Sequence, residues 1–228
     1  MNITSKELSQ LESFKDIDEK TITKILKMSE IKKYDTGHML FYDKERVNII
    51  YFLISGAVSL YKINENGQKK VIFMLDRGKI INEVIIKDLP ASINCEVIID
   101  ANILGIDKNE LLKIMEEDFQ LCKNIIISLS MKTRRMYRQL KNTPSSVKIE
   151  KKLAAKIYKL GRDYGVEHKK GTMIKMELTI TYMADFLGSP RETVSRAMKV
   201  LQREGLIIYK DKRIIIPEIS KLSKFFKS

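Results

Sequence analysis

Five polar residues near the C-terminal end of the chain are spaced so that a helix would place them on one face. They are Arg191, Glu192, Ser195, Arg196 and Lys199. An arginine guanidinium can donate two parallel hydrogen bonds to O6 and N7 of guanine, and a glutamate carboxylate can accept one from the amino group of cytosine. The set therefore favours the reading of base edges in a DNA groove. The solvated face of an ordinary helix is the alternative.

A pair of short helices is predicted to hold this face in place. Thr179 can cap the first helix, and Gly188 can form the sharp turn that ends it. Ser189 is predicted to cap the second helix, with Pro190 at its first position and Glu192 closing a capping box. The predicted buried positions are Met183, Ala184, Leu187, Val194, Met198 and Leu201. Two helices joined in this way are typical of a helix-turn-helix, and Thr179 and Ser189 are also predicted to contact DNA.

A short hairpin is predicted directly after the second helix. The β-type runs 206–209 and 213–216 are separated by Lys210, Asp211 and Lys212, so the hairpin has a basic tip that can contact phosphates. Further lysines precede the helix pair at positions 169, 170 and 175. The alternative is an edge hairpin without a binding role, but its place behind the second helix favours a wing.

The positive charge of the chain is concentrated in its C-terminal part. The net charge is +13, from 42 Lys and Arg against 29 Asp and Glu. Residues 145–228 hold 19 of the basic and 9 of the acidic residues, a net +10, which leaves a net +3 for residues 1–144. A basic surface attracts nucleic acid or an anionic membrane, although a lysine-rich composition alone is the alternative. The distribution favours a basic binding module attached to a nearly neutral one.

Residues 31–107 are predicted to form a small antiparallel barrel or sandwich. Short runs rich in β-branched and aromatic residues lie at 39–42, 49–54, 57–63, 70–75 and 96–99. Turn residues separate them, including Ser55-Gly56 and Asn66-Gly67; the latter is a hairpin signal because both residues tolerate positive φ. Short helices are predicted before this region, between residues 6 and 29.

An apolar seam runs through a predicted helical region between residues 109 and 141. Its members recur at alternating steps of three and four residues: Phe119, Cys122, Ile126, Leu129, Thr133, Met136 and Leu140. Two parallel helices need such a seam to pack together, so a homodimer is predicted. The alternative is packing against the chain's own barrel, which Leu121 and Ile125 are expected to do.

A break in this helix is expected at residues 142–146, because Pro144 prevents a continuing hydrogen bond and its polar neighbours favour turns. We therefore predict an α+β protein in three parts. Residues 1–108 form an antiparallel β-barrel that senses an effector, residues 109–144 a long dimerisation helix and hinge, and residues 145–228 a winged helix-turn-helix domain.

The chain resembles the Crp/Fnr family of bacterial transcription regulators over nearly all of its 228 residues. The most specific match is the run Gly188–Arg196, followed by Leu201 and residues 204–207, and residues 51–58 look like a strand pair of a cyclic-nucleotide-binding barrel. The resemblance implies a homodimer that binds a pseudo-palindromic operator in double-stranded DNA. It also implies a transcription activator or repressor that works with RNA polymerase. The base-reading positions that it implies are Arg191, Glu192 and Arg196.

The predicted sensor domain departs from the family pattern for cyclic AMP. In family members that bind this ligand, the resemblance implies a Gly-Glu-Leu turn and a later Arg-Ser pair that holds the phosphate. Here the turn reads Asn82-Glu83-Val84, and no arginine lies between Arg77 and Arg134. A buried phosphate without a guanidinium or equivalent donors is poorly stabilised. We therefore expect no tight binding of cyclic AMP; the candidate effector-pocket residues are Glu83, Asn82 and His38.

The chemical class of the effector stays open. Cys95 and Cys122 are the only cysteines, so they cannot hold a four-cysteine iron–sulfur cluster. One hypothesis is a haem that senses nitric oxide, as in regulators of nitrosative stress, with His38 or His168 as its axial ligand and a methionine or cysteine also eligible. The alternatives are a His38 with no ligand role, cysteine redox control, a small apolar ligand, and a regulator that needs no effector.

Other functional classes find little support in the sequence. The chain has no Gly-rich phosphate loop, no metal-ligand spacing and no Cys-His or Ser-His pairing with characteristic neighbours, so an enzyme is not expected. Its apolar runs are too short to span a bilayer and its first residues lack a signal-peptide core, so we expect a cytoplasmic protein without membrane contact. The competing function is a nucleotide-binding or membrane-associated regulatory module, which would explain the barrel but not the winged helix.

Overall fold

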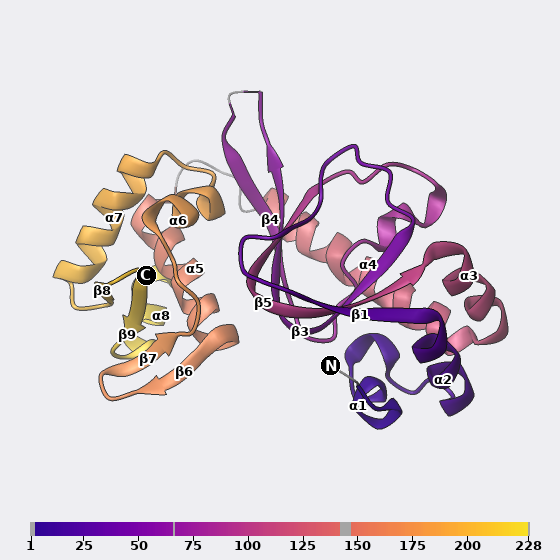
Figure 1. Cartoon of the computed structure of the whole chain (residues 1–228). Helices are drawn as coiled ribbons and strands as arrows, with labels where there is room; N and C mark the ends of the chain where they lie inside the picture. Colours follow the sequence, from indigo (N-terminus) through magenta and orange to yellow (C-terminus); the bar gives the residue numbers. More distant parts are fainter. Residues whose placement is uncertain (1–2, 66, 142–146, 228) are drawn as a thin grey trace. The chain divides into compact units, whose positions relative to one another are not determined.

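The computed structural model describes residues 3–65, 67–141 and 147–227, with the side chains of residues 138–141 outside the description. The chain forms two compact units (Figure 1). The barrel unit comprises residues 1–62 and 72–142, and the C-terminal unit comprises residues 63–71 and 143–228. Both units contain helices and strands, so the predicted α+β class is confirmed.

The barrel unit begins with the short helices that the sequence predicts. They are α1 (Ser5–Ser9), the 3₁₀ helix η1 (Glu12–Phe14) and α2 (Glu19–Met28). Its strands are β1 (Ser29–Tyr34), β2 (Met39–Phe41), β3 (Ile49–Ile63), β4 (Lys69–Asp76) and β5 (Asn94–Asp107), except that Ile63 and residues 69–71 are grouped with the C-terminal unit. The 3₁₀ helix η2 (Glu83–Lys87) lies between β4 and β5. The sheet has the order β1-β5-β3-β4, and β1, β2 and β3 all pair antiparallel with β5.

Strand β3 corrects the predicted turn at Ser55-Gly56. The sequence predicts two strands here, but β3 continues through both residues, because a shift in its register against β5 absorbs them as a bulge. Gly56 has φ +85° and lies so close to β5 that a Cβ atom would stand 2.7 Å from the Cα atom of Ala101. The glycine therefore marks a close backbone approach inside one long strand and not a chain reversal.

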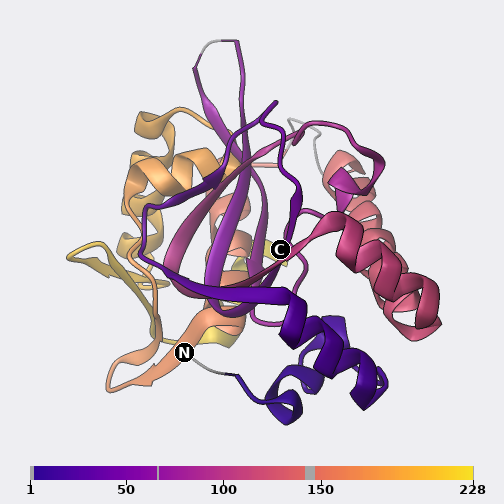
Figure 2. The same ribbon diagram turned by 45° about the vertical axis from the view of Figure 1, so that its right-hand side comes forward.

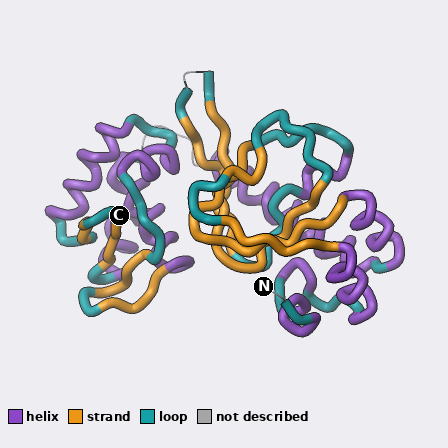
Figure 3. The backbone as a smooth tube through the Cα atoms, in the orientation of Figure 1, coloured by secondary structure: helices purple, strands orange, loops and turns teal. Residues whose placement is uncertain are grey.

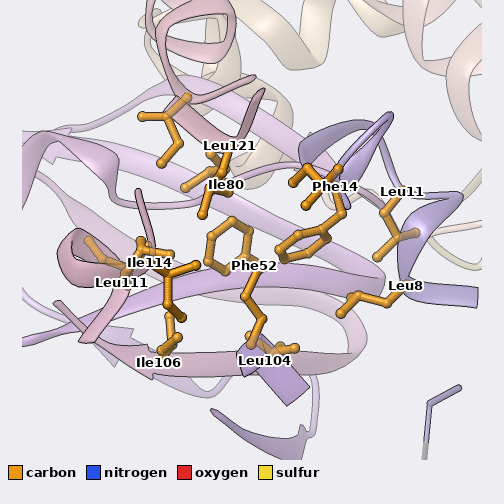
Figure 4. Close-up of a cluster of buried hydrophobic side chains, with 14 of the residues drawn as sticks. Leu8, Leu11, Phe14, Phe52, Ile80, Leu104, Ile106, Leu111, Ile114 and Leu121 are labelled. Atoms are coloured by element: carbon orange, nitrogen blue, oxygen red, sulfur yellow. The ribbon is translucent and has the colours of Figure 1, made fainter. Parts of the chain in front are cut away.

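Two hydrophobic cores hold the barrel unit together. In the first, helices pack on one face of the sheet (Figure 4): the Phe14 and Phe52 rings are in contact, with centroids 4.6 Å apart, and Leu111 and Leu121 join them. The second core fills the space among the strands with Phe41, Leu53, Val58, Leu60, Phe73, Leu75, Cys95 and Val97. Because Phe52 and Leu53 serve different cores, β3 is buried on both faces.

The predicted helical region between residues 109 and 141 is divided into two helices, α3 (Lys108–Glu117) and α4 (Phe119–Lys141). Asp118 separates them: its Oδ1 accepts hydrogen bonds from the backbone N–H groups of Gln120 and Leu121 at 2.9 and 3.2 Å. A side-chain cap of this kind starts a new helix. From this cap α4 runs as a long helix beside the strands of its unit (Figure 2).

In its described residues, the C-terminal unit combines four helices with a small sheet (Figure 3). The helices are α5 (Ile149–Tyr164), α6 (Ile180–Leu187), α7 (Arg191–Arg203) and α8 (Ile219–Lys227). The strands are β6 (Gly165–His168), β7 (Gly171–Ile174), β8 (Ile208–Lys210) and β9 (Arg213–Ile216), in the antiparallel order β6-β7-β9-β8. The β6–β7 hairpin and α8 were not predicted. His168 is the last residue of β6.

Candidate nucleic-acid interface

The first helix of the predicted helix-turn-helix is α6, and Thr179 caps it. The Thr179 hydroxyl accepts a hydrogen bond from the backbone N–H of Tyr182 at 3.0 Å. Gly188 ends the helix in the left-handed conformation, with φ +60°, and its N–H donates to the carbonyl oxygen of Ala184. Both features agree with the sequence prediction, because each depends only on neighbours within one helical turn.

The start of α7 corrects the predicted capping box. Pro190, and not Ser189, is the N-cap residue, and no side chain caps the helix there. Glu192 instead lies 3.6 Å from the guanidinium of Arg196, one turn further along. The first-turn N–H groups of α7 are therefore left for water or for an anion such as a phosphate, which the positive end of the helix dipole attracts.

Helix α7 has one buried face and one exposed polar face. Its buried residues are Val194, Ala197, Met198 and Leu201, and they pack the helix on α5 and α6. The opposite face carries the five residues singled out from the sequence: Ser195 is half-buried, and Arg191, Glu192, Arg196 and Lys199 are exposed. Arg191, Glu192, Ser195 and Arg196 surround a shallow hollow of about 320 Å³. The predicted spacing thus brings all five together, and their contacts with DNA stay a prediction.

The wing is the hairpin of β8 and β9. Asp211 and Lys212 form its two-residue turn, with φ +49° and +60°. Two left-handed residues give the turn a twist that matches the twist of the paired strands. The Lys210 and Lys212 side chains are exposed. The Lys212 ammonium lies 3.8 Å from a carboxylate oxygen of Glu177, a residue that precedes α6. The hairpin therefore presents basic side chains at a fixed place behind α7.

A partly buried lysine helps to join α5 to α6. The Lys156 ammonium stands 4.3 Å from the centroid of the Phe186 ring. Burial, and secondarily the charge of Lys159, lowers the pKa of Lys156 to about 8. The ring face favours the charged form and works against this shift, so Lys156 stays mostly protonated at neutral pH. It thus adds to the positive charge of the C-terminal unit.

The predicted dimerisation seam lies along α4, and part of it is exposed. Phe119, Ile126 and Met136 have 77%, 57% and 43% of their surface accessible, which is unusual for large apolar side chains. The half-buried seam residues are Cys122, Leu129 and Thr133, and Leu129 packs against the chain's own core; the side chain of Leu140 lies outside the described part. The alternative packing expected for Leu121 and Ile125 is confirmed, since both are buried in that core.

The candidate effector-pocket residues do not form one group. Asn82 is used by the fold: its Oδ1 accepts from the backbone N–H of Tyr51 at 2.9 Å, and its Nδ2 donates to the carbonyl oxygen of Ile49 at 2.8 Å. Glu83, next to it, is buried beside α4. His38 instead lies exposed in the turn before β2, with its ring 4.7 Å from that of Tyr34.

Sequence reasoning missed the two partners of Glu83 on α4. The Ser128 hydroxyl donates to one Glu83 oxygen at 2.7 Å, and the Lys132 ammonium donates to the other at 2.5 Å. A signal for them was present. Positions 128 and 132 continue, at helical spacing, the inward face of α4 that Leu121 and Ile125 begin, so a serine and a lysine there had to find polar partners.

Neither cysteine has the surroundings of a reactive thiol. Cys95 is fully buried in the strand core, and burial raises the pKa of its thiol far above the usual value, so the nucleophilic thiolate is not formed. The Cys122 thiol donates to the carbonyl oxygen of Met115 at 3.1 Å. Among the described residues no cluster of three or more His, Cys, Asp or Glu is placed to hold a metal ion. No helix of that part is long and apolar enough to cross a membrane.

Comparison with known proteins identifies both units. Residues 31–118 match the cyclic nucleotide-binding domain, and residues 151–225 match the Crp-like helix-turn-helix domain. A CRP-like cAMP-activated global transcriptional regulator of Mycobacterium tuberculosis is 19% identical over 92% of this chain and 94% of its own. The HTH-type transcriptional regulator ArcR of Staphylococcus haemolyticus is 24% identical over 94% of both chains.

A solved structure with the same fold is that of the c-di-GMP responsive global regulator CLP of Xanthomonas campestris. Its TM-score is 0.78 at 18% identity, over 88% of this chain and all of that one. The names of these relatives specify different small molecules, so the shared fold does not by itself identify an effector.

Proposed function

The chain belongs to the Crp/Fnr family of transcription regulators, which are not enzymes, and we propose that it acts as a homodimer that binds a pseudo-palindromic operator with sequence specificity. The observation that carries the proposal is the face of α7, where Arg191, Glu192, Ser195 and Arg196 line one hollow on a helix whose other face is buried. Such a helix fits the major groove, with the wing lysines near the phosphate backbone. The exposed seam of α4 supports the homodimer.

Substitution of Arg191 tests the assignment of this face. Arg191→Ala is expected to weaken binding to the preferred duplex by about 1 to 3 kcal/mol and to relax the preference at one base pair of each half-site, because a bidentate contact to guanine is lost. Selection from a random duplex library gives the operator, and fluorescence anisotropy at fixed salt gives the affinities.

Arg203→Ala is the matched control, because Arg203 is an exposed arginine in the last turn of the same helix. Its loss should weaken binding to all sequences by a similar small factor, as expected for charge alone. If both variants changed affinity and base preference equally, Arg191 would not read a base.

We propose that the DNA affinity responds to an effector other than cyclic AMP. Two features support this: the barrel strands β1 to β5 carry no arginine for a buried phosphate, and the Glu83 carboxylate already has two partners within the protein. A haem that senses nitric oxide is the specific candidate, with His38 as ligand, and the exposed position of His38 does not favour it. Calorimetry should show no micromolar binding of cyclic AMP. A Soret band that appears with haemin and is lost in His38→Ala would support haem.

The regulator is expected to act in the cytoplasm, where its DNA target is found, and to work with RNA polymerase. Transcription in vitro from a promoter that carries the selected operator distinguishes an activator from a repressor. Unchanged transcript levels with saturating protein would contradict a direct effect on RNA polymerase.

A further inference from the structure

The buried pair of Lys132 and Glu83 connects the barrel to α4. The Lys132 ammonium donates to Glu83 Oε2 at 2.5 Å and to the carbonyl oxygens of Ile80 and Ile81 at 3.0 and 3.2 Å. The other carboxylate oxygen accepts from Ser128, one turn earlier on the same helix. Three ammonium protons and two carboxylate oxygens are thus all engaged, which is the condition under which a buried ion pair is tolerated.

The pair is well shielded from water. The Glu83 side chain has no accessible surface, and that of Lys132 has 13%. Burial lowers the pKa of Lys132, and the charge and hydrogen bond of Glu83 oppose this shift. With one partner removed, the other would be left as an uncompensated charge in the interior, so each group requires the other in place.

A second lysine holds the other end of the same short segment. Helix η2 runs from Glu83 to Lys87 and ends at Asp88, which adopts the left-handed conformation with φ +49°. The Asp88 carboxylate forms an ion pair with Lys108, the first residue of α3, whose side chain is almost fully buried. Helix η2 is therefore tied to α4 at its beginning and to α3 at its end, through charges that belong to the chain itself.

We propose that Lys132 is a positioning residue that fixes α4 against the barrel in place of a diffusible ligand, so that the ligand-free protein is the form that binds DNA. This inference rests on the proposed function, because it takes α4 to be the dimerisation helix. It gives a direction to regulation: a molecule that competes with Lys132 for Glu83 releases α4 and weakens DNA binding.

Truncation of the lysine with chemical rescue tests this role. Lys132→Ala removes three side-chain carbons and the ammonium group. The n-propylammonium ion has three carbons and an ammonium group, so it can replace what the variant lacks. We expect the purified wild type to bind its selected duplex without added ligand. We expect Lys132→Ala to weaken both dimerisation, by sedimentation, and DNA binding, by anisotropy, at least about 10-fold, as the loss of a buried charge partner implies. Millimolar n-propylammonium chloride should restore most of both losses.

Two controls make the rescue specific. Tetramethylammonium chloride at the same ionic strength should not rescue, because it has no N–H donors. Lys123→Ala removes an exposed lysine from the same helix and should change either constant less than 2-fold. The proposal is overturned if Lys132→Ala behaves like Lys123→Ala, or if both ammonium salts restore binding equally.

A double variant covers the case in which Lys132→Ala does not fold. Lys132→Met with Glu83→Gln leaves no buried charge, so it should fold, yet dimerise and bind DNA weakly and show no response to n-propylammonium. If this variant bound the duplex with wild-type affinity, the ion pair would not be needed to position α4, and the proposal would be overturned. The two measurements distinguish failure of the proposed function from failure of this inference. A wild type that binds no DNA in the anisotropy assay refutes the proposed function, whereas an unchanged dimer of both Lys132 variants in sedimentation refutes only this inference.

Discussion

Replacement of Ile126 by glutamate is expected to leave the protein monomeric and to weaken binding to a two-fold symmetric duplex by about 100-fold or more. Ile126 lies in the middle of the α4 seam and is 57% exposed in the isolated chain. In a parallel pair of helices a carboxylate at this position would face its copy in an apolar interface. A monomer then binds each half-site separately and loses the gain from engaging both. Sedimentation gives the oligomeric state, and anisotropy gives the affinity.

Ile127→Glu is the matched control for this experiment. Ile127 is the next residue, is also an exposed isoleucine, at 45%, and points about 100° away around the helix. It should leave the dimer and the DNA affinity nearly unchanged. A duplex with a single half-site supplies the second check, because the Ile126→Glu variant keeps every residue of α7 and should bind this duplex as well as a wild-type monomer does. If both variants lost dimerisation and DNA affinity equally, the seam would not be the dimer interface.

Gly56→Ala is expected to destabilise the protein by about 2 to 5 kcal/mol. Two costs add up: the left-handed φ of +85°, which non-glycine residues adopt at a cost of about 1 to 3 kcal/mol, and the overlap of the new Cβ with β5. The neighbouring atoms belong to the backbone of residues 99–101, so no side-chain rotation can relieve the overlap. Urea unfolding followed by circular dichroism measures the loss.

Gly37→Ala separates the two costs. Gly37 has nearly the same φ, +92°, but no atom lies within 4 Å of the position of its Cβ. The variant should therefore lose only the conformational part, about 1 kcal/mol, near the low end for a left-handed residue. If Gly56→Ala were no more destabilised than Gly37→Ala, the bulge could move away from β5 at little cost, and the close packing of the two strands would not limit stability.

Local signals explain which parts of the fold the sequence predicts correctly. Thr179 and Gly188 act on backbone groups within one turn, and the buried face of α7 follows from its helical spacing. One error arises where a distant neighbour decides: the bulge at Gly56 depends on its fit against β5. The capping box fails for a local reason, because the N-cap residue is Pro190, which has neither a side-chain acceptor nor an N–H for Glu192 to accept from. Asp118 was missed because an acidic residue without Gly or Pro is a weak sign of a helix end.

In the candidate sites, too, the sequence predicts what depends on near neighbours and misses what depends on distant ones. The residues of the α7 face lie within nine positions of each other, so periodicity alone brings them together. Glu83 and Lys132 are 49 residues apart, and no local rule connects them. Only the folded barrel shows that the carboxylate expected to face an effector meets an ammonium from the same chain.

The ion pair between Glu192 and Arg196 makes these two side chains partners before DNA arrives. At 3.6 Å and in full contact with water it contributes less than about 1 kcal/mol, so it opens easily. A base pair that offers an acceptor to the arginine and a donor to the glutamate gives each side chain a new partner when the ion pair opens. A base pair that offers only one leaves a charged group stranded in the groove. On the proposed reading of bases by α7, recognition would be a competition between this internal ion pair and the base pair, and a base pair that satisfies only one of the two side chains would be disfavoured.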